Sequence, residues 1–65
     1  MEYTNTQIRT LIDEYIHSQR DRKMLYRRLV DGATFEILSM EFVMSERQIR
    51  TIVHRNEEIL FRHLA

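Results

Sequence analysis

Hydrophobic residues recur at spacings of three and four along most of this chain. That spacing gathers them on one side of a helix, and no stretch shows the alternation typical of a strand. The pattern predicts four helices, at about residues 5–18, 19–30, 34–42 and 46–64. With no proline and one glycine, the chain has few other points at which a helix would break. We therefore expect a single all-α domain over residues 1–65.

Short polar residues stand where the predicted helices begin, and they are suitable N-caps. These residues are Thr4, Ser18, Thr34 and Ser45. Gln7 and Gln48 lie three residues after the first and last of them, which is the spacing of a capping box. Asp31-Gly32 follows the second helix, and glycine readily takes the left-handed conformation that closes a helix.

Residues 34–55 combine a short helix, a tight turn and a longer helix with an arginine-bearing outer side. Apolar residues occupy the facing sides of the two helices, at Leu38, Phe42, Ile49, Ile52 and Val53. This is the pattern of a helix-turn-helix, whose second helix usually enters the major groove of DNA. We expect residues 46–64 to form that second helix.

The outer side of the last helix carries the predicted DNA-binding residues, Arg47, Arg50, Thr51, His54 and Arg55. Arginine can bind guanine through two hydrogen bonds, and threonine can contact the thymine methyl group. The alternative is that these five residues form only a charged, solvent-exposed side of the helix and bind no DNA. Free N–H groups at helix starts suit a phosphate, so we assign Thr34, Ser45 and Gln48 either to phosphate contact or to capping alone.

Residues 25–64 resemble region four of bacterial sigma factors and the small sigma-like proteins of phages and bacteria. The resemblance rests on a leucine-rich helix, Leu25-Tyr26-Arg27-Arg28-Leu29, followed by Asp31-Gly32, Thr34-Phe35-Glu36 and Ser45-Glu46-Arg47-Gln48-Ile49-Arg50-Thr51-Ile52. It covers about two thirds of the chain. It implies a DNA-binding regulator of transcription, with Arg47, Arg50 and Thr51 where relatives meet base edges or phosphates. The lack of cysteine and of a signal peptide is simplest to explain by a cytoplasmic location.

Two residues depart from that family pattern. Val43 occupies a turn position that is usually glycine, and strain in a β-branched residue at positive φ favours a reshaped turn. Glu46 stands where a basic residue is frequent, and it would repel phosphate. The sequence holds no promoter-melting region, so we expect an isolated region-four-like module rather than a complete sigma factor.

Composition limits the function further. The chain has 65 residues, no cysteine, and ten basic against ten acidic side chains. Zero net charge argues against strong nucleic-acid binding, but residues 20–30 are rich in arginine and lysine. That cluster could contact the DNA backbone, although a solubilising face paired with Asp13, Glu14 or Asp31 is favoured. No apolar run approaches the roughly 18 residues that a membrane span needs, and no signal peptide is evident, so we expect neither membrane binding nor export.

Catalysis and metal binding find little support. The three histidines are His17, His54 and His63, and their spacing does not place them on one helical turn. No cysteine nucleophile or glycine-rich phosphate loop is present. We therefore expect no enzyme activity, no cofactor and no metal.

An alternative function belongs to another class: a protein-interaction module that keeps this fold without reading DNA. Ile37 and Met40 fall opposite the apolar side of their helix and, joined by Met44, suggest a protein interface. The partner would be RNA polymerase or a second copy forming a homodimer. A small structural subunit of a phage is a third alternative. Phe61 is also on an outer side, and we expect the first helix to cover it.

Overall fold

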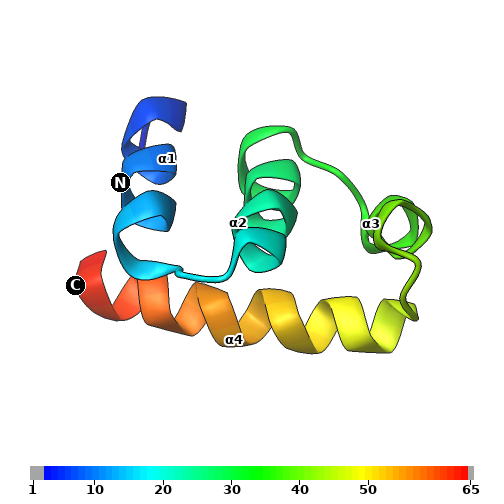
Figure 1. The fold of residues 1–65 in the computed structure, drawn as a ribbon. Coiled ribbons are helices and arrows are strands. Elements are labelled where there is room, and N and C mark those ends of the chain that lie inside the picture. The colour runs from blue at the N-terminus through cyan, green and yellow to red at the C-terminus, as the bar shows by residue number, and fades with distance from the viewer. Residues whose placement is uncertain (1–2, 65) are drawn as a thin grey trace.

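The computed structural model describes residues 3–64, and these form four α-helices with no strand among them. The helices are α1 (Asn5–Tyr15), α2 (Gln19–Leu25), α3 (Phe35–Phe42) and α4 (Glu46–Leu64), and a π-helical segment, η1 (Tyr26–Val30), continues α2. α4 runs along one side of the molecule (Figure 1). The other helices lie against it, with α1 near its C-terminal end and α3 near its start (Figure 1). The predicted all-α fold is confirmed.

Side chains cap the helix starts, as the sequence predicts. The Thr4 and Gln7 side chains bind each other's backbone N–H at 3.2 and 2.8 Å. Ser45 and Gln48 repeat the arrangement at 3.1 and 3.0 Å, which fixes the first turn of α4. Because each hydroxyl accepts from an N–H that has no partner within its helix, these contacts set the helix starts locally.

α1 ends at Tyr15, three residues before the predicted end. Ile16 already has extended backbone, and its side chain turns inward and is 2% exposed. Arg22 then satisfies the freed carbonyls, since its Nε donates to Ile16 O and its Nη2 to Asp13 O at 2.7 Å. The residues before Ser18 must leave helical geometry, because Ser18 itself is extended as the N-cap of α2. The two helices can therefore pack side by side.

The second predicted helix changes type halfway. From Tyr26 to Val30 the chain is π-helical, and Asp31 N donates to Tyr26 O at 3.2 Å. Gly32 then takes φ 75° and lets Ala33 N reach Arg27 O at 2.9 Å, as the predicted glycine closure requires. A π-helical turn holds about one residue more than an α-helical turn. No pattern in the sequence indicates this change of helix type.

Two apolar clusters make up the core, and α2 belongs to both. The cluster near the turn contains Met24, Ala33, Leu38, Ile49, Ile52 and Val53. The cluster near α1 contains Ile12, Ile16, Leu25 and Leu60. Met24 and Leu25 are neighbours in sequence, and both are fully buried in different clusters. The predicted apolar sides of the helices thus pack as expected, with α4 as the common base.

The turn between α3 and α4 is left-handed rather than reshaped. Val43 has φ 53° and ψ 52°, and its side chain is 89% exposed. This residue lets Met44 N close on Ser39 O at 3.0 Å. The expectation that valine would force another turn is wrong, because closure of α3 outweighs a backbone strain of about 1–3 kcal/mol.

Candidate nucleic-acid interface

The outer face of α4 is open to solvent. All five residues predicted to contact DNA are exposed on it: Arg47, Arg50, Thr51, His54 and Arg55. Ile49 and Val53, on the opposite side of the helix, are fully buried. The amphipathic pattern therefore places these five residues on the side of α4 opposite its buried side.

One flank of this face is built on an aromatic ring, and we call it the aromatic flank: Arg28, Phe35, Arg50 and His54. The guanidinium carbons of Arg28 and Arg50 lie 4.2 and 5.1 Å from the Phe35 ring centroid. The His54 ring meets the Phe35 ring edge-on at 6.1 Å. A ring face attracts a cation without neutralising its charge. Arg50 is thus oriented by the ring, and among residues 3–64 no carboxylate lies within ion-pair distance of it.

The other flank is built on a carboxylate, and we call it the carboxylate flank: Arg20, Asp21, Arg55 and Asn56. Asp21 is 6% exposed and Asn56 is 5% exposed. One Asp21 oxygen accepts from Arg20 Nε at 3.1 Å, and the other accepts from Asn56 Nδ2 at 3.1 Å and lies 3.9 Å from Arg55 Nη2. Asn56 Nδ2 also donates to Ile52 O at 2.9 Å. A nearly buried anion therefore holds two exposed arginines beside α4.

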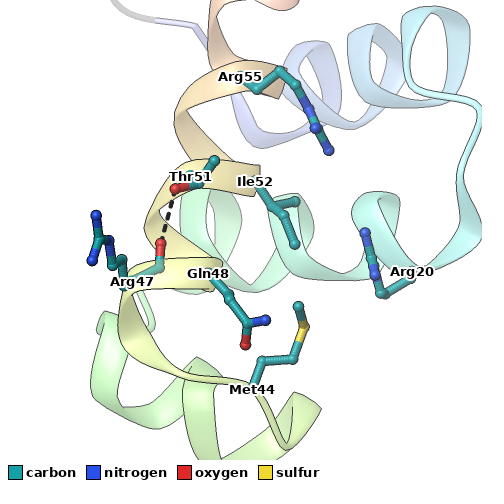
Figure 2. A pocket seen from close by; sticks show the side chains of 7 residues that line it. All are labelled: Arg20, Met44, Arg47, Gln48, Thr51, Ile52 and Arg55. Carbon is teal, nitrogen blue, oxygen red and sulfur yellow. Dashed lines mark hydrogen bonds between the residues drawn. The ribbon is translucent and has the colours of Figure 1, made fainter.

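A shallow hollow of about 400 Å³ lies beside these arginines. Figure 2 shows Arg20 from α2, and Arg55 and Ile52 from α4, on its borders, with Met44 on the side toward α3. The Arg47 guanidinium points away from the other two (Figure 2). Thr51 donates its hydroxyl to Arg47 O at 3.0 Å, so its methyl group and oxygen are already oriented. Three arginines line the hollow, Arg20, Arg47 and Arg55, against the one nearby carboxylate of Asp21, and this excess of positive charge suits an anionic group.

The sequence favoured a solubilising face for Arg20 over contact with the DNA backbone and did not reveal its pairing with Asp21 beside α4. The available signal was Asn56, which falls on the buried side of α4. A buried amide needs a polar partner from another helix, and such a partner would have pointed to Asp21 and its neighbour. The distance between positions 21 and 56 in the chain hid that pairing.

The helix-start residues act as caps in this structure. Thr34 Oγ1 accepts from Ile37 N at 3.1 Å, and Ser45 and Gln48 bind each other. Capping is confirmed, while phosphate contact by these residues stays a prediction. Glu36 and Glu46 lie in the first turns of α3 and α4, where helix dipoles favour carboxylates. These two charges oppose phosphate at both helix starts.

Arg27 is not part of the carboxylate flank and binds acidic side chains elsewhere. It donates to Glu41 on α3 at 2.5 to 3.1 Å and to Asp31 at 3.1 Å. Hydrogen bonding to Arg27 holds the pKa of Glu41 below its usual value, and the two carboxylates raise the pKa of Arg27. The predicted pairing of this basic run with acids is thus correct for Arg27 and Asp31, but Arg22 binds the carbonyl of Asp13 rather than its carboxylate.

The predicted protein interface is only partly assembled. Ile37 and Met40 are 39% and 67% exposed. Met44 instead packs against the core and lines the hollow beside Arg20, so it does not join them. Its position after the left-handed turn directs it inward. Phe61 was expected to be covered by the first helix and remains 53% exposed, because α1 packs against the Leu60 side of α4.

Among residues 3–64, no group of three metal-ligating side chains lies together. Within the same part of the chain, no helix is both long enough and apolar enough to cross a bilayer. α3, the turn at Val43 and α4 form a helix-turn-helix with a charged outer face. No protein-family model, curated protein or solved structure matches this chain.

Proposed function

We propose that this protein binds double-stranded DNA through α4 in the major groove and regulates transcription. The observation that carries the proposal is the open face of α4, where Arg47, Arg50 and Thr51 stand together in solvent. An α-helix fits the major groove, and arginine and threonine are suited to its base edges. The resemblance to sigma factor region four supports the same function.

The two flanks would divide the contacts. Arg50 is held by an uncharged ring, so its full charge and its paired N–H donors remain available for a guanine. Arg20 and Arg55 border a hollow next to the helix, where a backbone phosphate would approach. Because net charge is zero and Glu46 lies nearby, a single module should bind weakly. RNA polymerase or a second copy would then supply further affinity.

The test is titration of a randomised duplex library at low and moderate salt, followed by selection of bound sequences. We expect binding at low salt, and loss of most of it in Arg47→Ala/Arg50→Ala. Arg62→Ala is the control, because it removes an exposed charge from α4 about 18 Å beyond Arg50 at 1.5 Å per residue. Failure of the wild-type protein to bind any duplex at low salt contradicts the proposal.

Single substitutions separate base contacts from backbone contacts. Arg50→Ala should cost about 1–3 kcal/mol on the preferred sequence and relax selection at one base pair. Arg20→Ala should weaken all sequences alike and reduce the slope of log affinity against log salt by about 1. Equal loss of selectivity in both variants would contradict this division of roles.

A further inference from the structure

α3 carries an apolar surface that the core does not use. Among the described residues, four large apolar side chains are exposed, and three of them belong to α3 or its turn. We call these three, Ile37, Met40 and Val43, the α3 outer patch. Leu38 is fully buried on the opposite side of the helix. Figure 1 shows α3 at the far end of the molecule from α1, next to the start of α4.

The backbone conformation of Val43 is energetically unfavourable. A β-branched residue in the left-handed region is strained, and glycine would relieve the strain without losing any packing, because the side chain is 89% exposed. Strained residues that persist without a packing reason mark functional positions. An exposed valine at this apex therefore points to a contact made outside the domain.

The charges around the patch restrict what can cover it. The charged residues between positions 31 and 46 are all acidic: Asp31, Glu36, Glu41 and Glu46. Glu36 is four residues before Met40, and Glu41 is four residues after Ile37, so a carboxylate borders each side of the patch. Arg27 neutralises Glu41, whereas Glu36 forms no ion pair within residues 3–64. DNA would be repelled, and a second copy placed about a twofold axis would bring like charges together.

We propose that the α3 outer patch docks another protein through an apolar helix face bordered by lysine or arginine. Apolar residues of the partner would cover Met40 and Val43, and its cations would pair with Glu36 at the rim. This surface is separate from the outer face of α4, so the inference does not depend on DNA binding.

The probe is a synthetic amphipathic helical peptide with leucine along one face and lysine along both borders. The control peptide replaces every lysine with glutamate. Each is titrated into the isotope-labelled protein and followed by amide chemical shifts. We expect the lysine peptide to shift signals of residues 36–44 and the glutamate peptide to leave them unchanged. No shifts with either peptide, equal shifts with both, or shifts confined to residues outside α3 would overturn the proposal.

Val43→Gly separates docking from folding. It should raise the thermal midpoint by relieving strain and yet weaken the lysine peptide, whereas a purely structural valine would show no loss of binding. Met40→Ala should weaken binding about tenfold, as expected for losing most of a buried methionine side chain. Glu36→Gln should weaken it about twofold, and less at high salt. Unchanged peptide affinity in all three variants, or self-association of the protein that Met40→Ala abolishes, would overturn the proposal.

Discussion

The two flanks of α4 hold arginines by different means. Arg50 lies over the ring of Phe35, while Arg20 and Arg55 gather around the carboxylate of Asp21. A ring is apolar and is cheap to bury without a partner. A carboxylate is not, because an unpaired buried charge is strongly destabilising. On the aromatic flank, the stability of the fold therefore depends little on whether the arginine stays in place. On the carboxylate flank, the position of the arginines and the stability of the fold depend on each other.

The largest expected effect comes from cutting the link between Asp21 and Asn56. Asn56→Ala removes the 3.1 Å hydrogen bond to a carboxylate that is nearly buried. The free energy of unfolding should fall by about 1.5–3 kcal/mol, measured by urea denaturation. The control is Glu58→Ala, an exposed site on the same helix, with an expected change within about 0.5 kcal/mol.

The double variant Asp21→Ala/Asn56→Ala sharpens this test. If the cost arises from the stranded carboxylate, removing it as well should restore part of the stability, so the two single losses should not add. If the two losses in free energy of unfolding add strictly, the hydrogen bond between Asp21 and Asn56 contributes no coupling energy. The carboxylate flank would then not link the placement of its arginines to stability.

A smaller effect is expected on the aromatic flank. Phe35→Leu keeps an apolar side chain but removes the ring that Arg28 and Arg50 cover. Loss of an exposed cation–π contact should lower the free energy of unfolding by about 0.5–1 kcal/mol. In the Phe35→Leu/Arg50→Ala cycle the two losses should overlap. A loss larger than that of Asn56→Ala would break the comparison, because the ring would then matter more to the fold than the carboxylate.

The smallest effect concerns the exposed pair of Arg27 and Glu41, which serves as a reference for an ion pair in water. Because the folded pKa of Glu41 lies below its ordinary value of 4.5, the pair contributes stability above pH 4.5 and loses it as pH falls through the folded pKa. Glu41→Gln should therefore be slightly less stable than wild type at pH 7 and equal to it in strong acid. A difference that grows on acidification would contradict this sign.

Features set by neighbouring residues could be predicted from the sequence. Thr4 with Gln7 and Ser45 with Gln48 bind within four residues of each other, so their spacing alone determines the cap. The apolar sides of α3 and α4 likewise follow from helical periodicity. The outer face of α4 is exposed because the same periodicity places the apolar residues on the opposite, buried side.

Features set across the chain could not be predicted in the same way. The end of α1 depends on Arg22, which reaches back to carbonyls at positions 13 and 16. The place of Arg20 beside α4 depends on the contact between Asp21 and Asn56, 35 residues apart. Val43 follows the geometry of helix closure against the preference of its own side chain. Each outcome is decided by a partner or a constraint that local spacing does not contain.

Met24 and Leu25 place consecutive side chains of α2 in the two apolar clusters. Opening either cluster would expose one of these side chains to water and displace the backbone that positions the other. α2 thus connects the two clusters, and the domain should unfold in a single cooperative transition. Its central amides should accordingly exchange their hydrogens only when the whole molecule opens.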